Sequence, residues 1–264
     1  MAYVEFLRLR NGIAICWSIL IALAVSGIVA LELLGLGHHI QLDESDMTGV
    51  PVSILAGLAI YPAAGMTTGF GWSLNRASEN GEIVWTRPFS RVALALRYML
   101  IDTAGIVLTF FVALGLYILV ALVFASVAHS PKAVLFGGDT VAAIALGVGV
   151  CFMWFGLVQA ATAWYSGRGG MVAGLSWAAF IILATLAAVK IEPFHTIIMA
   201  LNFLNPLAYK SLSGFVTSDL SSVSTFHSGF SVIGLGVWTR VALAWAIGAV
   251  TCALAIHAWK RVEL

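Results

Sequence analysis

Long apolar stretches separated by polar connections dominate the chain. They cover residues 13–36, 50–72, 98–127, 140–164, 171–189 and 237–259. Because backbone N–H and C=O groups cannot remain unpaired in hydrocarbon, an apolar run of about 20 residues indicates a helix that crosses the bilayer. The pattern predicts an all-α integral membrane protein with six transmembrane helices, forming a single domain over residues 1–264.

Composition supports a membrane environment. Hydrophobic residues make up 61% of the chain and charged residues 9%, whereas soluble domains are about 45–50% apolar and about 25% charged. The net charge of +1 comes without any basic run, which argues against nucleic-acid binding.

The distribution of lysine and arginine predicts the orientation, because basic residues are enriched in cytoplasmic loops. Both termini, the connection after the second span and the connection after the fourth span hold nine of the 13 basic residues: Arg8, Arg10, Arg76, Arg87, Arg91, Arg97, Arg168, Lys260 and Arg261. The opposite face holds the other four, which are Lys132, Lys190, Lys210 and Arg240. We expect both termini on the cytoplasmic side of the inner (plasma) membrane.

The N-terminal region has two interpretations. Basic residues precede the first apolar run, and an Ala22-Leu23-Ala24 segment follows, which is compatible with a cleaved signal peptide. The run continues for about ten apolar residues beyond that point, as a spanning helix does. We therefore predict a first transmembrane helix, preceded by a short N-terminal interfacial helix over residues 3–10.

The connection after the second span, residues 73–97, is longer than a simple turn requires. It is interrupted at Asn80-Gly81 and again at Pro88. A short helix is expected between these breaks, with Ile83, Val84 and Trp85 forming an apolar ridge.

A second long connection, residues 190–236, lies on the predicted external face. Residues 194–204 are apolar but cover only about half the length needed to span a bilayer. This length predicts an interfacial or re-entrant helix. After Asn205-Pro206 the chain becomes polar and serine-rich.

Known catalytic motifs are absent from the chain. No G-x-x-x-x-G-K-[ST] segment occurs, so the chain lacks the phosphate-binding loop of an ATPase. H-E-x-x-H, G-x-S-x-G and CxxC are also absent. Gly167, Gly169 and Gly170 are typical of a tight turn rather than a nucleotide loop. We predict that the chain is not an enzyme.

Potential metal ligands and buried charges are few. His38 and His39 lie near Asp43, Glu44 and Asp46, but neighbouring side chains point apart on a helix, so no metal site is predicted. Cys16, Cys151 and Cys252 are expected to be packed thiols. Glu32, Asp102 and His257 are placed near helix ends, with Asp102 in the first turn or two of the third helix, which disfavours a proton-coupled secondary transporter.

Three short segments carry a family resemblance. The first contains Glu79, Gly81, Glu82, Ile83, Val84, Trp85, Arg87, Pro88 and Arg91; the second contains Asn205, Pro206 and Tyr209; the third is the tail 259–264. With the six-span layout, they resemble the ABC-2 type permeases, the membrane subunits of ABC exporters. The resemblance implies that the first segment is a coupling helix that docks on an ATPase, and that the second belongs to an external helical hairpin.

The resemblance also implies the partners. Relatives work as a pair of permease subunits with two copies of an ABC ATPase subunit, so this chain would bind no cofactor while ATP and Mg would bind to the ATPase. Trp85 is the expected anchor of docking, because aromatic residues dominate interface energetics; the alternative places its ring among lipid headgroups.

Several questions stay open. The cargo would be amphipathic, lipid-like, peptide or drug-like, and the permease pair could be a homodimer or a heterodimer. The alternative functions are an intramembrane lipid-modifying enzyme, a proton-coupled secondary transporter and a scaffold. Small residues such as Gly105, Gly115, Gly147 and Gly149 are expected to permit close approach of helices.

Overall fold

Helices account for nearly all of the structure, a computed structural model. It describes residues 14–15, 17–22, 25, 50–79, 90–127, 134–136, 140–165, 168–186, 191, 193–206 and 236–261. The elements in order are β1 (Val50–Pro51), α3 (Val52–Glu79), α5 (Arg91–Val127), β2 (Val134–Leu135), α6 (Thr140–Trp164), α7 (Gly169–Leu186), α8 (Phe194–Asn202) and α10 (Val237–Arg261).

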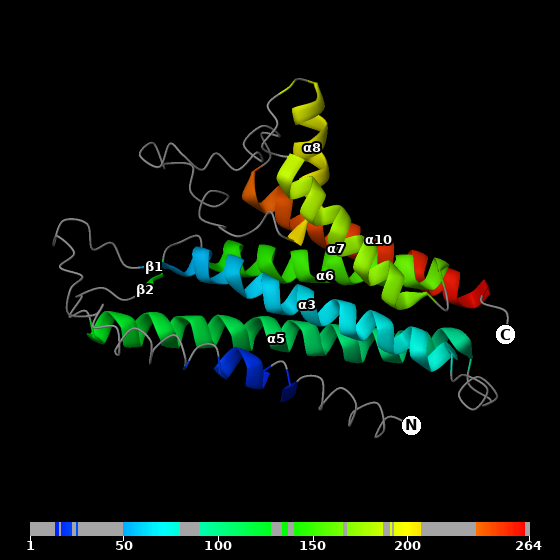
Figure 1. The fold of residues 1–264 in the computed structure, drawn as a ribbon, viewed down its shortest axis with the longest axis horizontal. Coiled ribbons are helices and arrows are strands. Elements are labelled where there is room, and N and C mark those ends of the chain that lie inside the picture. The colour runs from blue at the N-terminus through cyan, green and yellow to red at the C-terminus, as the bar shows by residue number, and fades with distance from the viewer. Residues whose placement is uncertain are drawn as a thin grey trace.

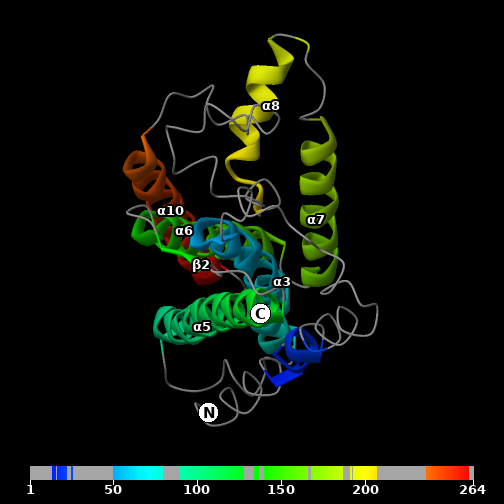
Figure 2. The ribbon, with the colours of Figure 1, turned by 90° about the vertical axis from the view of Figure 1, so that its left-hand side faces the viewer.

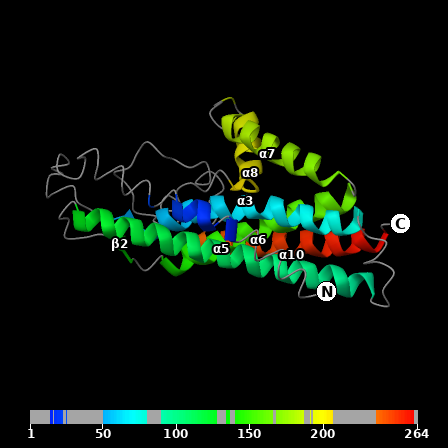
Figure 3. The same cartoon turned by 60° about the horizontal axis from the view of Figure 1, so that its bottom comes forward.

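Four of these helices, α3, α5, α6 and α10, lie lengthwise against one another and form the bundle (Figure 1). In this bundle α3, α6 and α10 run in one direction and α5 runs in the other. End-on, α7 and α8 stand to one side of the bundle (Figure 2). The same separation is visible after rotation (Figure 3). The bundle therefore forms the core, and α7 with α8 forms a peripheral hairpin.

Three helices in the described part are long and apolar enough to cross a membrane: residues 95–123 of α5, α6 over Thr140–Trp164, and residues 238–259 of α10. Within their most apolar windows, 72% of α6 is buried, against 28% of α5 and 33% of α10. The chain is accordingly described as a helical membrane protein in which α6 is the interior helix of the bundle.

Glycines allow α6 and α10 to approach closely. A Cβ added at Gly156 would contact Thr251 Oγ1 and lie 2.8 Å from the carbonyl oxygen of Gly248. A Cβ added at Gly248 would lie 3.1 Å from the backbone nitrogen of Met153. Trp245 Nε1 also donates to the carbonyl oxygen of Ala145 at 3.2 Å. Small residues at the contact let the two backbones pack directly.

The glycine prediction is confirmed in part. An added Cβ at Gly147 would lie 2.7 Å from the Phe110 ring, and one at Gly149 would lie 2.9 Å from Trp245. At Gly115 an added Cβ would meet nothing within 4 Å, because that residue faces outward from the bundle, so no described helix of this chain approaches closely there. Gly156 and Gly248, which make the closest backbone contacts, were not predicted.

Helix α3 meets α6 at a point near its internal proline. Pro62 has no N–H and cannot bond the carbonyl group four residues earlier. Two residues on, the carbonyl oxygen of Ala64 accepts a hydrogen bond from Trp154 Nε1 at 3.1 Å and another from Thr67 Oγ1. These bonds connect the proline-containing turn of α3 to the middle of α6.

Several predicted elements can be compared with the helices. A helix was predicted over residues 140–164, and α6 covers those residues; α7, α8 and α10 lie within a few residues of the predicted ranges. The first predicted span falls mainly outside the described residues. Two bounds were wrong, because α3 continues to Glu79 and α5 already begins at Arg91. In α3 the added residues 73–79 are mostly polar, and polar residues can continue a helix beyond its apolar part.

Candidate functional site

The predicted coupling segment connects the end of α3 to the start of α5. Glu79 is the last residue of α3 and Arg91 is the first residue of α5. Gly81, Glu82, Ile83, Val84, Trp85, Arg87 and Pro88 lie outside the described residues. Because α3 and α5 run in opposite directions, both attachment points are at the same end of the bundle (Figure 1).

The start of α5 is fixed by a cap. Ser90 Oγ accepts a hydrogen bond from the backbone N–H of Ala93 at 3.2 Å. This is the geometry of a serine N-cap, which satisfies one of the free N–H groups of the first turn. The connection between the two helices therefore has a defined end at Ser90, directly before Arg91.

Helix α8, which directly precedes the second predicted segment, forms a hairpin with α7. Asn202 Nδ2 donates to the carbonyl oxygen of Leu183 at 3.2 Å, and Asn205 Nδ2 donates to that of Phe180 at 3.0 Å. Asn205 Nδ2 also lies 2.9 Å from Asn202 Oδ1. Leu183 is among the last four residues of α7, whose carbonyl groups have no partner within the helix. The asparagine pair thus holds α8 antiparallel to the end of α7.

Of this segment, Asn205 and Pro206 are described and both are buried, whereas Tyr209 lies outside the described residues. Asn202 was not predicted. Its signal was available in the sequence, because two asparagines three residues apart at the end of an apolar helix lie on one face.

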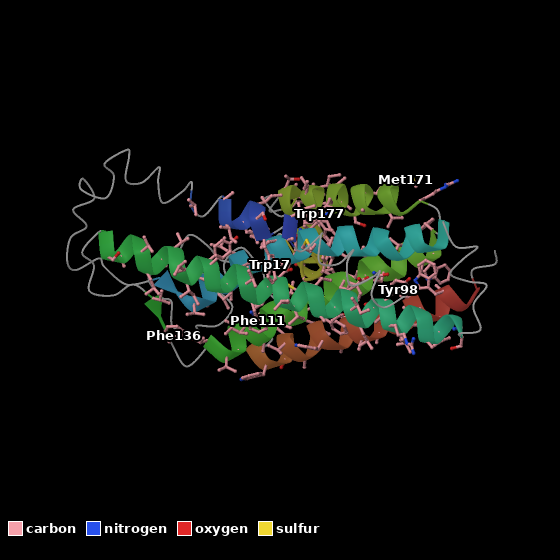
Figure 4. All side chains as sticks on the ribbon, turned by 90° about the horizontal axis from the view of Figure 1, so that it is seen from below. Trp17, Tyr98, Phe111, Phe136, Met171 and Trp177 are labelled. Atoms are coloured by element: carbon pink, nitrogen blue, oxygen red, sulfur yellow. The ribbon has the colours of Figure 1, made fainter. Side chains whose placement is uncertain are left out.

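An aromatic cluster attaches α7 to the bundle. The Trp154 ring of α6 lies edge-on to Trp177 and Phe180 of α7, with ring centroids 5.5 and 4.8 Å apart. Figure 4 shows Trp177 on the side of α7 that faces the bundle. Edge-to-face pairs contribute about 0.5–1.5 kcal/mol beyond the burial of their area. Phe180 therefore contacts the bundle with its ring, and its carbonyl oxygen accepts a hydrogen bond from Asn205, three residues after α8.

Charged and polar side chains are buried inside the bundle, contrary to one prediction. Asp102 is 4% exposed and Arg240 is 8% exposed. Asp102 was predicted in the first turn or two of its helix near water, but α5 begins at Arg91, so Asp102 is about three turns in. Arg240, counted above with the outer face, lies in the first turn of α10. Gln159 of α6 is 0% exposed.

The histidines and cysteines considered as metal ligands can be checked only in part. His38 and His39 lie outside the described residues. Across the parts of the chain that the structure describes, no three His, Cys, Asp or Glu side chains come together as a metal site would require. Cys151 is a buried free thiol and Cys252 a partly buried one, as packed thiols were predicted to be.

Comparison with known proteins gives no match: no family model, no curated protein and no solved structure resembles the chain closely enough to count. The likeness to ABC-2 permeases therefore remains a prediction from the three sequence segments.

Proposed function

We propose that this chain is the membrane-spanning permease subunit of an ABC exporter, with six transmembrane helices and both termini in the cytoplasm. It moves an amphipathic, lipid-like, peptide or drug-like cargo outward. The energy comes from ATP, hydrolysed with Mg by a separate ABC ATPase present in two copies. A second permease subunit, identical or homologous, completes the assembly.

The observation that carries the proposal is the position of the two helix ends that residues 80–89 connect. The end of α3 and the start of α5 lie at the same end of the bundle, and α5 has a capped start at Ser90. A displacement of this segment would act directly on α3 and α5, both of which contact the interior helix α6. Such an arrangement suits transmission of a push from an ATPase into the membrane helices.

The hairpin of α7 and α8 also supports the proposal. A nine-residue helix is too short to cross a bilayer, and here the buried Asn202 and Asn205 hold it against α7. In the proposed exporter this hairpin covers the outer end of the transport path.

The proposal is tested by changing Trp85 to Ala. The full chain, affinity-purified from membranes of its native host, is expected to co-purify with a P-loop ATPase and with ATP hydrolysis activity. Trp85→Ala should lower the amount of ATPase recovered and the ATP hydrolysis at least tenfold, because loss of a buried aromatic anchor costs about 2 kcal/mol or more of binding free energy.

The matched control is Trp164→Ala. Trp164 ends α6 at the same end of the bundle and is 66% exposed. If Trp85 served only to hold the chain among lipid headgroups, the two variants would behave alike. Equal recovery of the ATPase with both variants would contradict the docking role.

A proton-coupled secondary transporter is the second candidate, favoured by the burial of Asp102 inside α5. Ionisable residues within membrane helices are typical of proton and ion pathways. Vesicles holding the purified chain alone separate the two: cargo uptake driven by a pH gradient, with no ATPase present, would support this candidate and contradict the exporter.

A further inference from the structure

Helix α7 contributes little to the buried core. Among the residues of α7 whose side chains the structure describes, Val172 alone is buried. Leu175, Ile181 and Ile182 are each more than half exposed. Figures 1 and 3 show α7 close to the bundle at its first turns and diverging from it toward α8. The helix therefore lies beside the bundle without being packed into its centre.

An aromatic cluster that is separate from the main core joins α7 to the bundle. We call it the Trp154 cluster; it consists of buried Ala64, Trp154 and Val158, with Trp177 and Phe180 of α7 packed against them. Trp154 Nε1 donates to the carbonyl oxygen of Ala64 on α3 at 3.1 Å. Its ring centroid lies 4.8 Å from that of Phe180 and 5.5 Å from that of Trp177. The hydrogen bond to α3 thus fixes the direction of the ring that the two α7 side chains contact.

The hairpin of α7 and α8 is held together by its own hydrogen bonds. Asn205 Nδ2 donates to the carbonyl oxygen of Phe180, and Asn202 Nδ2 donates to that of Leu183. Both acceptors lie in the last two turns of α7. Because these bonds tie the end of α8 to α7, a movement of α7 carries α8 with it.

The start of α7 is suited to bending. Gly169 and Gly170 are its first two residues, and the turn before it is closed by a bond from the Arg168 N–H to the carbonyl oxygen of Tyr165 at 3.1 Å. Glycine has no Cβ, so its backbone changes conformation easily, and hinges commonly lie at the ends of elements. A rotation there is amplified along the helix, since Ile182 is about 18 Å beyond Gly170 at 1.5 Å per residue.

We propose that α7 and α8 form one arm that rotates about Gly169 and Gly170, and that the Trp154 cluster is the latch that holds this arm in its closed position against the bundle. Opening separates the rings of Trp177 and Phe180 from that of Trp154. In a bilayer the separated rings meet lipid instead of water, so no hydrophobic penalty opposes opening and the specific contacts of the latch set the balance. The inference does not depend on the exporter proposal.

The test is the measurement of distances between spin labels by pulsed electron resonance on the full chain in lipid nanodiscs, with the native cysteines replaced. One label is at Leu108→Cys on α5. The second is at Ile182→Cys on α7, at Ile197→Cys on α8 or, for the bundle itself, at Val250→Cys on α10; all four positions are exposed. The closed position gives one main distance for each pair.

The latch is weakened by Phe180→Leu, which removes the closer of the two ring contacts and leaves the backbone carbonyl group that Asn205 bonds. The ratio of a longer distance to the main distance should rise at least threefold for both arm pairs, because an aromatic pair stabilises beyond its buried area. The pair within the bundle should not change. Phe180 is only partly buried and lies on the peripheral helix, so the bundle still folds in this variant.

A second variant, Trp154→Phe, keeps a ring but removes the N–H donor that orients it, and should also raise the ratio. Its matched control is Trp245→Phe. Trp245 Nε1 likewise donates to a carbonyl oxygen of another helix, that of Ala145 at 3.2 Å, and its ring lies 5.5 Å from that of Phe152. These contacts join α10 to α6 and do not involve α7, so the control should leave both arm pairs unchanged.

The hinge is tested by adding Gly170→Ala to Phe180→Leu. Gly170 is exposed, so the new methyl group has room, and alanine favours the helical backbone over other conformations. The ratio should return toward the wild-type value. An unchanged ratio would place the pivot elsewhere and overturn the hinge.

Three results would overturn the latch. The first is an unchanged distance in both arm pairs with Phe180→Leu and Trp154→Phe. The second is an equal change with Trp245→Phe, which would mean a general loosening of the bundle. The third is a change confined to the label at Ile197, which would mean that α8 moves without α7.

Discussion

At the scale of single residues, Gly156 occupies the tightest contact of the bundle. A side chain there would meet Thr251 Oγ1 and the backbone of Gly248 on α10. Backbone atoms in the middle of a helix cannot move aside as a flexible side chain can. Close approach of α6 and α10 therefore requires glycine at this position.

We predict that Gly156→Ala destabilises the protein by about 1–3 kcal/mol, the usual cost of overpacking a core. Unfolding of the purified protein in mixed detergent measures the change. The matched variant is Gly115→Ala on α5, where the new methyl group meets nothing within 4 Å; it should leave stability unchanged or slightly higher, because alanine favours helix. A similar decrease in the free energy of unfolding in both variants would show that the contact between α6 and α10 is not the cause of the destabilisation.

A comparison of Gly115 with Gly147 explains why the roles of the glycines could be only partly predicted. All the glycines considered lie in apolar helices, and a membrane helix carries no polar face to indicate which side is packed. Gly115 and Gly147 look alike in sequence, yet Gly147 contacts Phe110 and Gly115 faces outward. Only the arrangement of the helices distinguishes them.

At the scale of elements, α8 depends on two asparagines for its position. Asn205 Nδ2 bonds both the carbonyl oxygen of Phe180 and Asn202 Oδ1. Loss of these bonds leaves buried acceptors unsatisfied, which costs about 1–3 kcal/mol. This loss of free energy should destabilise the hairpin of α7 and α8 rather than the bundle, since these hydrogen bonds lie within the hairpin.

Asn205→Leu is accordingly predicted to speed amide hydrogen exchange in residues 194–202 by about tenfold or more, because a loss of about 1.4 kcal/mol or more in the free energy of local opening implies that factor. Exchange in α6 should stay unchanged. Thr185→Val serves as the control on α7, because Thr185 Oγ1 bonds only the carbonyl oxygen of Ile182 in its own helix. Faster exchange with the threonine variant as well would mean that α7 itself, and not the asparagine pair, controls α8.

Helix extents were more predictable than helix environments. The apolar run over residues 140–164 corresponds to α6, because apolar length and the need to pair backbone groups both favour a helix there. The prediction for Asp102 was wrong for a related reason. The apolar run predicts a start at residue 98, whereas α5 begins seven residues earlier, directly after the Ser90 cap. A single capping serine is a weaker signal than an apolar run.

At the scale of the whole molecule, the bundle has two distinct ends. The attachment points of the coupling segment lie at one end, together with the last residues of α6 and α10. Gly236, directly before α10, lies at the other end. Helix α10 has 25 residues and is therefore about 37 Å long, more than the roughly 30 Å of a hydrocarbon core.

This length predicts that Ser90 and Gly236 face opposite sides of the membrane. With the native cysteines replaced, Ser90→Cys should react with a membrane-impermeant maleimide only in inside-out vesicles, and Gly236→Cys only in intact cells or right-side-out vesicles. Both residues are exposed, so access within the protein should not limit labelling. Trp164→Cys, at the end of α6, provides the internal control, because it should label from the same side as Ser90. Labelling of Ser90→Cys and Gly236→Cys from one side would be incompatible with α10 as a spanning helix, and with the push across the membrane that the exporter requires.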